Sequence, residues 1–172
     1  WSEVLKAVPN SRLRLKAKAL GDKMTRARIV QNFADHGIEE TRLDLMAWIT
    51  GTSPLGAYHS IDIGLDTFPY HGTTTTMEAL WMGVPVVTLA GAWHASRVGV
   101  SILARVKADE LIAATPSDYL KIATTLANKP DVMTEFRRHL RSMVVRGGLT
   151  DGASFTTEIE AAYHDAWEEF LQ

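Results

Sequence analysis

The segment from residue 61 to residue 89 constrains the fold more than any other part of this chain. It begins with an apolar strand pattern at 61–66 and runs through the loop sequence HGTTTT into a helical pattern at 77–82. Gly83 is placed to end that helix, and the sequence VPVVTL at 84–89 has the pattern of a buried strand. A strand, a loop of small residues, a helix and a second buried strand make a parallel βαβ unit. We therefore expect an α/β fold.

Patterns elsewhere in the chain extend this expectation. Further strands are expected at 13–17 and 42–46, and 109–113 is either a short strand or a turn. Helices are expected at 1–8, 26–35, 94–103, 118–128, 131–145 and 155–171, with Thr25, Ser117 and Pro130 at the starts of three of them. Strands that alternate with helices predict a Rossmann-like, doubly wound parallel sheet with helices on both faces and a helical C-terminal tail. We expect one domain over 1–172.

Composition excludes several classes of protein. The chain has 172 residues, of which 46% are hydrophobic, so a sizeable core is expected. Its formal net charge of −2 gives no reason to expect a nucleic-acid partner. The sequence holds no cysteine, which excludes disulfides and thiolate metal sites, and no apolar run of membrane-spanning length. Without signals to the contrary, a cytoplasmic protein is expected.

The run Thr73, Thr74, Thr75 and Thr76 is the main candidate for a binding site. One threonine is enough to cap a helix, and threonine is a poor helix former, so an ordinary cap does not explain four in succession. The N-terminus of a helix attracts anions through its free N–H groups and its dipole. Together with Gly72, the run predicts a phosphate-binding loop, and Glu78, one turn further, is placed to accept hydrogen bonds from ribose hydroxyls.

Three more polar residues flank this loop. His71 and His94 lie beside glycines at predicted strand ends, on the edge where open α/β sheets bind ligands, so contact with a ligand is predicted for both. Arg97 has two interpretations: it neutralises phosphate charge, or it anchors its helix by pairing with an acid. Asp62 and Asp66 share a strand face, but no Asp-x-Asp pair occurs, so no metal site is expected.

Several segments of the chain resemble the C-terminal, donor-binding half of the O-GlcNAc transferase (Spindly-like) family of GT-B glycosyltransferases. They are LDTFPYHGTTTT at 65–76, MEALWMGVPVVTL at 77–89 and SRV at 96–98, with VPNSRLRLKA at 8–17 and AAYHDAWEEF at 161–170 in matching order. The resemblance implies a metal-independent enzyme that transfers GlcNAc from UDP-GlcNAc to Ser/Thr of a protein. It places the UDP pyrophosphate on the threonine loop and the ribose at Glu78, and it gives Asp66 the task of shaping the turn into that loop.

The resemblance also implies that this chain is part of a longer protein. The family's catalytic lysine and glutamine lie upstream of the segment matched at 8–17, so no catalytic residue is expected here and the isolated chain should bind without turnover. No cofactor is expected, and the protein acceptor would bind through the other half. The apolar face of the last helix, with Ile159, Tyr163 and Trp167, would pack on that half, so self-association of the isolated chain is expected.

Two positions depart from the family pattern. Many relatives have histidine where this chain has Thr73, and histidine again where it has Pro54, whose loop here lacks a cation. Trp48 is a candidate for stacking on a uracil base. The departures leave two alternatives open: a donor other than UDP-GlcNAc, such as GDP-fucose or UDP-glucose, and a non-catalytic binding module.

Overall fold

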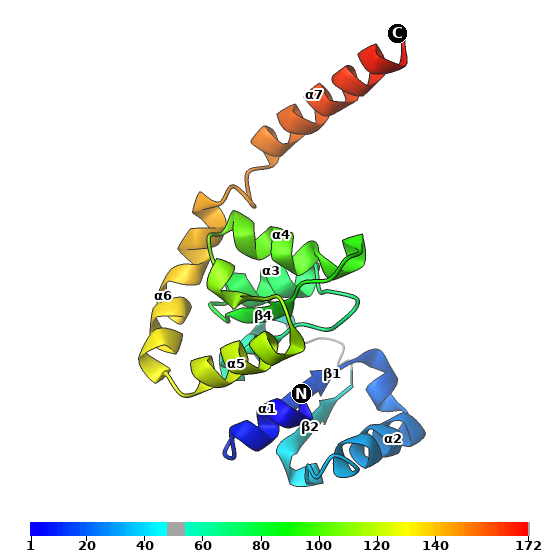
Figure 1. Ribbon diagram of the computed structural model, residues 1–172, viewed down its shortest axis with the longest axis vertical. Helices are drawn as coiled ribbons and strands as arrows, with labels where there is room; N and C mark the ends of the chain where they lie inside the picture. Colours follow the sequence, from blue (N-terminus) through cyan, green and yellow to red (C-terminus); the bar gives the residue numbers. More distant parts are fainter. Residues whose placement is uncertain (48–53, 172) are drawn as a thin grey trace.

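The computed structural model describes residues 1–47 and 54–171 (Figure 1). The α-helices are α1 (Ser2–Ala7), α2 (Lys23–Ala34), α3 (Thr74–Trp81), α4 (Val98–Arg105), α5 (Pro116–Ala127), α6 (Pro130–Arg146) and α7 (Gly152–Phe170). The strands are β1 (Leu13–Lys16), β2 (Leu43–Met46), β3 (Gly64–Leu65), β4 (Val86–Leu89) and β5 (Ile112–Ala113). Short 3-10 helices are η1 (Lys18–Gly21), η2 (Glu40–Arg42), η3 (Pro54–Ser60), η4 (His94–Ser96) and η5 (Asp109–Leu111).

All described strands pair in parallel, which confirms the α/β class predicted from the sequence. β1 pairs with β2, and a second sheet has the order β3-β4-β5. The described ladders therefore form two sheets where one was expected. The strand predicted at 61–66 shortens to Gly64–Leu65, because only these two residues pair with β4. The segment predicted at 109–113 divides into η5 and β5.

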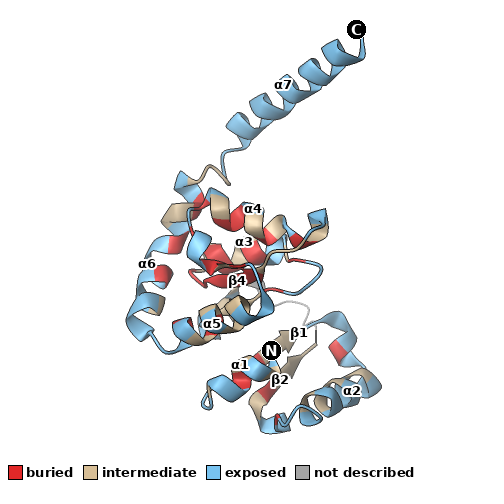
Figure 2. Ribbon diagram, viewed as in Figure 1, coloured by how far each residue is buried: buried red, intermediate tan, exposed pale blue. Residues whose placement is uncertain are grey.

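The main hydrophobic core surrounds β4. Val86 and Val87 are 4% and 0% exposed, and α3, α4 and α5 enclose the strand (Figures 1 and 2). A smaller cluster joins α1, β1 and β2 through Leu5, Leu13 and Leu43. The chain therefore buries its apolar side chains on both faces of β4, as a doubly wound parallel fold requires.

Gly83 ends α3 and allows α6 to approach it closely. Its φ is +78°, in the left-handed region, and a Cβ at this position would lie 2.6 Å from the carbonyl oxygen of Arg137 in α6. Any side chain would push α6 away from α3. The prediction that Gly83 ends this helix is confirmed.

Two predicted helix caps are wrong by a few residues. Asp22 caps α2, because its carboxylate accepts a hydrogen bond from the backbone N–H of Thr25, which lies inside the helix. Thr115 caps α5, where its hydroxyl accepts from the backbone N–H of Asp118, and the predicted cap Ser117 lies within the first turn. In both helices the first side chain able to reach the free N–H groups forms the cap.

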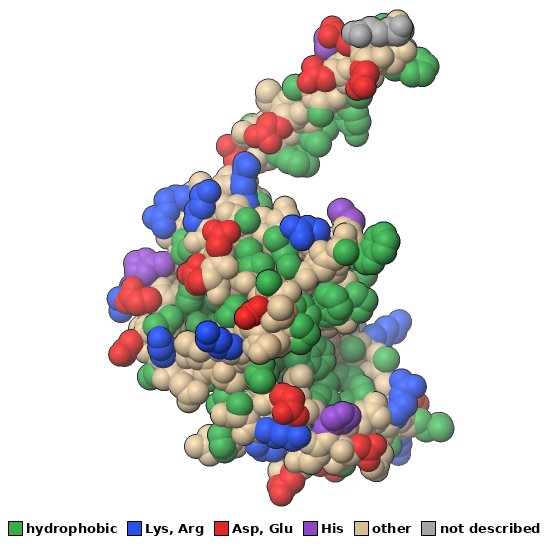
Figure 3. All heavy atoms as spheres, in the orientation of Figure 1, with side chains coloured by type: hydrophobic (Ala, Val, Ile, Leu, Met, Phe, Trp, Pro, Cys, Tyr) green, Lys and Arg blue, Asp and Glu red, His purple; other side chains and the backbone are tan. Residues whose placement is uncertain are grey.

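The last helix extends away from the rest of the molecule (Figure 1). No residue of α7 is buried, and Tyr163, Trp167 and Phe170 are 74%, 59% and 79% exposed (Figure 2). The apolar face predicted for this helix is therefore present and open to solvent, and Figure 3 shows hydrophobic side chains along one side of it. None of the described helices is long and apolar enough to cross a membrane.

Candidate functional site

The N-terminus of α3 lies directly after the loop that follows β3. Thr73, Thr74 and Thr75 are exposed, and no described side chain caps the helix or places a carboxylate in its first turn. The first N–H groups of the helix therefore have no side-chain acceptor among the described residues and lie beside three exposed threonines. Such an arrangement binds an anion through hydrogen bonds and through the helix dipole.

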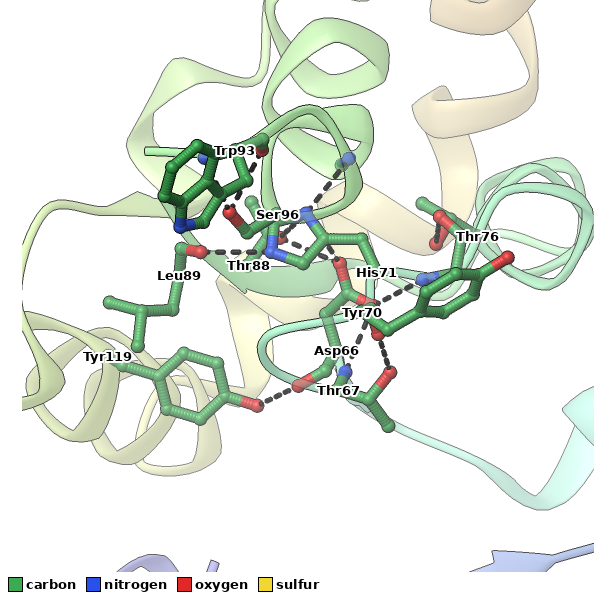
Figure 4. Close-up of polar contacts among 12 residues, drawn as sticks. Asp66, Thr67, Tyr70, His71, Thr76, Thr88, Leu89, Trp93, Ser96 and Tyr119 are labelled. Atoms are coloured by element: carbon green, nitrogen blue, oxygen red, sulfur yellow. Dashed lines mark hydrogen bonds and ion pairs between the residues drawn. The ribbon is translucent and has the colours of Figure 1, made fainter. Parts of the chain in front are cut away.

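Thr76 has a different role from the three threonines before it. It is 3% exposed, and its hydroxyl donates to the carbonyl oxygen of Gly72 at 3.0 Å (Figure 4). The Thr76 hydroxyl is therefore used inside the loop, and the predicted contact of Thr76 with the donor stays a prediction for its backbone N–H. Gly72 is also sterically required, since a Cβ there would lie 2.5 Å from the Thr75 hydroxyl and 2.8 Å from that of Thr76.

Asp66, at the end of β3, holds the loop in place. One carboxylate oxygen, Oδ1, accepts from the backbone N–H groups of Thr67 at 3.0 Å and Gly72 at 2.8 Å. The other, Oδ2, accepts from the hydroxyl of Thr88 in β4 at 2.7 Å (Figure 4). The carboxylate thus joins both ends of the loop to the neighbouring strand, which confirms that Asp66 shapes this turn. Asp62 lies apart, with a side chain that is 92% exposed.

His71 belongs to the same internal network. Its side chain is fully buried; Nδ1 accepts from the backbone N–H of Gly99 at 3.1 Å and Nε2 donates to the carbonyl oxygen of Leu89 at 2.9 Å. The donor Gly99 N–H assigns the neutral tautomer with its proton on Nε2. The prediction that the His71 side chain contacts a ligand is therefore corrected: both ring nitrogens are engaged in the interior, where they link the loop that precedes α3 to β4 and α4.

Gly99, near the start of α4, completes this packing. A Cβ there would lie 2.5 Å from Thr88 Oγ1, 2.6 Å from Asp66 Oδ2 and 3.1 Å from His71 Nδ1. All three atoms belong to buried side chains, which have no space to retreat. The sequence patterns did not single out Gly99, because its importance depends on three neighbours that are distant along the chain.

Glu78 faces a surface pocket beside the threonine loop. The pocket has a volume of about 390 Å³, and its lining residues are Leu55, Thr74, Met77, Glu78, Trp81 and Thr150. Apolar walls with two hydroxyls and one carboxylate suit a nucleoside, whose base is flat and whose ribose carries hydroxyl donors. The predicted ribose acid therefore lines a cavity that also reaches the predicted phosphate loop.

Tyr58 of η3 is a neighbour of Glu78 that the sequence patterns did not identify. Its hydroxyl lies 3.2 Å from Glu78 Oε2 and 3.1 Å from the carbonyl oxygen of Thr75. Burial, together with the negative charge of Glu78, raises the pKa of Tyr58 to about 12. The phenol therefore stays protonated and donates its hydrogen bond at any ordinary pH.

His94 and Arg97 lie on the next loop of the same sheet edge. Both side chains are exposed, and the His94 side chain makes no hydrogen bond within the described part of the chain. Arg97 donates from Nη1 to the carbonyl oxygen of Gly91 at 3.2 Å and makes no ion pair with an acid among the described residues. Its other interpretation, neutralisation of phosphate charge, stays a prediction. The exposed loop carries the indole of Trp93 as well, 79% exposed (Figure 4).

Two predictions fall outside what can be described. Trp48 lies outside the described residues, and so does most of the loop that precedes Pro54.

Within residues 1–47 and 54–171, no group of three or more His, Asp or Glu side chains is arranged to hold a metal ion.

Comparison with known proteins finds similar sequences over nearly the whole chain. The model of glycosyl transferase family 41 matches residues 1–159. The protein from Hordeum vulgare named probable UDP-N-acetylglucosamine–peptide N-acetylglucosaminyltransferase SPINDLY is 42% identical over 99% of this chain, which spans 18% of that protein. The UDP-N-acetylglucosamine–peptide N-acetylglucosaminyltransferase of Caenorhabditis elegans is 27% identical over 99% of this chain and 14% of its own length.

A solved structure is similar throughout. A mutant of the O-GlcNAc transferase of Thermobaculum terrenum superposes with a TM-score of 0.92 at 40% identity, over 98% of this chain and 32% of that one. The chain thus spans about a fifth of the length of the curated relatives that it matches. The resemblance noted in the sequence and the parallel α/β architecture are both confirmed, and the chain belongs to glycosyl transferase family 41.

Proposed function

We propose that this chain forms the nucleotide-sugar-binding half of a protein O-glycosyltransferase that transfers GlcNAc from UDP-GlcNAc to Ser/Thr hydroxyls. The observation that carries the proposal is the uncapped N-terminus of α3, which lies next to the pocket lined by Thr74 and Glu78. The names of the related proteins supply the donor and the peptide acceptor. The pyrophosphate would lie against Thr73–Thr75, and the ribose would lie at Glu78.

The chemistry that this half supplies is stabilisation of the leaving group. When the glycosidic bond to the β-phosphate breaks, negative charge develops on the departing diphosphate. N–H groups and hydroxyls that already point at this position stabilise that charge without reorganising. Asp66 and His71 keep the loop in this arrangement from the protein interior. A metal ion would be unnecessary for such a mechanism.

Nucleotide titration tests the proposal. UDP should bind, and the paired change Thr74→Val and Thr75→Val should weaken binding by about 1–3 kcal/mol, roughly 5- to 150-fold in Kd, because two hydroxyl donors are lost at nearly constant volume. Thr156→Val with Thr157→Val is the matched control, since these adjacent threonines lie near the start of α7 and their hydroxyls bond only to carbonyls of their own helix. Equal affinity for UDP in the Thr74/Thr75 variant would overturn the phosphate assignment.

The lining of the pocket leaves two alternatives to a UDP-GlcNAc transferase open. No Lys, Arg or His is among the residues that line the pocket. A donor with another base or sugar, GDP-fucose or UDP-glucose, and a binding module without catalysis are both compatible with such a lining. Parallel titrations with UDP and GDP test the base and the binding itself: tighter GDP binding favours GDP-fucose as the donor, and binding of neither nucleotide favours the non-catalytic module.

A further inference from the structure

The contact between Tyr58 and Glu78 joins two elements, η3 and α3, that each contribute a residue to the lining of the proposed nucleoside pocket. Tyr58 belongs to η3 and Glu78 to the second turn of α3, and both are partly buried. The Tyr58 hydroxyl donates toward Glu78 Oε2 at 3.2 Å and the Thr75 carbonyl oxygen at 3.1 Å. A carboxylate and a carbonyl only accept, so the phenol is the donor in both contacts and shares its single proton between the two acceptors.

This contact leaves one carboxylate oxygen for a ligand. Glu78 makes no other hydrogen bond or ion pair with the described residues, and it lines the pocket with Thr74. A glutamate side chain without a partner samples several rotamers, which a ligand must freeze when it binds. The bond from Tyr58 restricts Glu78 before the ligand arrives, so that Oε1 remains as an oriented acceptor.

The phenol is well suited to this task. It carries no charge, so it orients Glu78 without forming an ion pair that would compete with ribose hydroxyls for the carboxylate. The pKa of about 12 keeps it a donor across the pH range in which the protein would work. Its second acceptor, the Thr75 carbonyl, belongs to the first turn of α3, where the phosphates are proposed to bind. The same hydroxyl therefore holds η3 against both the first turn of α3 and the acid.

We infer that Tyr58 is a positioning residue that holds the Glu78 carboxylate for the ribose hydroxyls and so makes the site select ribonucleotides over deoxyribonucleotides. The inference rests on the proposed function, because it assumes that the pocket takes a nucleoside diphosphate. It does not depend on the base, since the ribose is common to UDP and GDP.

Four ligands and one conservative change test the inference. Tyr58→Phe removes the hydroxyl and keeps the ring, and Kd is measured for UDP, 2′,3′-dideoxy-UDP, GDP and 2′,3′-dideoxy-GDP. For the nucleotide that the wild type binds, Tyr58→Phe should raise the Kd of the ribose form roughly 3- to 10-fold, the usual range for one lost hydrogen bond. The Kd of the dideoxy form should not change, because it lacks the hydroxyls that Glu78 would accept from.

Two further variants show whether the effect passes through Glu78. In a Glu78→Ala background, adding Tyr58→Phe should leave the ribose preference unchanged. Tyr119→Phe is the matched control: its phenol, also partly buried, donates to the backbone carbonyl of Asp66 at 3.0 Å and not to Glu78, so it should not alter the preference.

The outcomes distinguish the positioning role of Tyr58 from the proposed function of the chain. If the wild type prefers the ribose form and Tyr58→Phe keeps that preference, the positioning role is wrong while the proposed function stands. If neither UDP nor GDP binds the wild type, the proposed function fails, and the positioning role fails with it. A smaller preference in Tyr58→Phe, together with wild-type preference in Tyr119→Phe, supports the inference.

Discussion

Removing the Thr88 hydroxyl should measure how much the buried network behind the proposed phosphate loop contributes to stability. Thr88 is 0% exposed, and its hydroxyl donates to Asp66 Oδ2 at 2.7 Å. Thr88→Val keeps the shape of the side chain and suits a strand, so the change removes the bond to Asp66 together with the 3.2 Å contact between the hydroxyl and His71 Nδ1. Because the Asp66 side chain is only 4% exposed, water cannot replace the lost donor.

The size of the effect follows from the type of bond. A hydrogen bond to a charged group contributes about 1.5–3 kcal/mol, and the buried carboxylate would keep only its contacts to the Thr67 and Gly72 N–H groups on the other oxygen. We expect the free energy of unfolding to fall by about 2 kcal/mol. For a domain of this size that corresponds to a Tm lower by about 4–8 °C.

Urea and thermal unfolding followed by circular dichroism measure this change directly. Thr134→Val is the control, because its exposed hydroxyl bonds only to the Pro130 carbonyl oxygen within α6, and it should stay within about 0.5 kcal/mol of the wild type. If Thr88→Val is as stable as the control, the Asp66 network does not stabilise the fold as reasoned here.

Four further results are expected. Gly99→Ala should destabilise by about 1–3 kcal/mol, measured by urea unfolding, because its Cβ would meet three buried polar atoms; a neutral effect would refute this packing. Burial raises the pKa of Tyr58 to about 12, so its contribution to stability is complete below pH 10 and is lost as the pH rises toward 12; a Tm series should show a shallower decline in Tyr58→Phe. UDP affinity should be the same with and without EDTA, and a loss on chelation would contradict the metal-free proposal. Light scattering should detect dimers or larger species through the exposed face of α7, and a strictly monomeric chain would contradict this.

The sequence predicted the elements whose patterns are local. The helix α3, its end at Gly83 and the strand β4 follow from apolar periodicity and a glycine stop, and the structure has all three. The sequence also contains enough information to predict the start of α5. Thr115 is followed by proline and, three residues later, by Asp118, which is the signature of a capping box. The prediction placed the cap at Ser117, which lies closer to the apolar pattern of the helix, and the start of α5 was therefore predicted two residues too late.

The candidate site was predicted less completely because parts of it depend on tertiary contacts. The loop sequence indicated an anion site at the threonines, but it could not show that Thr76 and His71 turn inward, since their partners lie in the loop itself, at Leu89 and at Gly99. Tyr58 was missed for the same reason: it meets Glu78 across 20 residues of sequence.

One measurement tests the central claim, that the N-terminus of α3 is the nucleotide site. Backbone amide shifts of the ¹⁵N-labelled chain are followed by NMR during titration with UDP. The largest shifts should occur at Thr74, Thr75 and Thr76, with smaller ones at Glu78, because these N–H groups would bond to the phosphates. Shifts centred instead on the pocket of about 330 Å³ beside Arg105 and Arg146, or no shifts at all, would contradict the account.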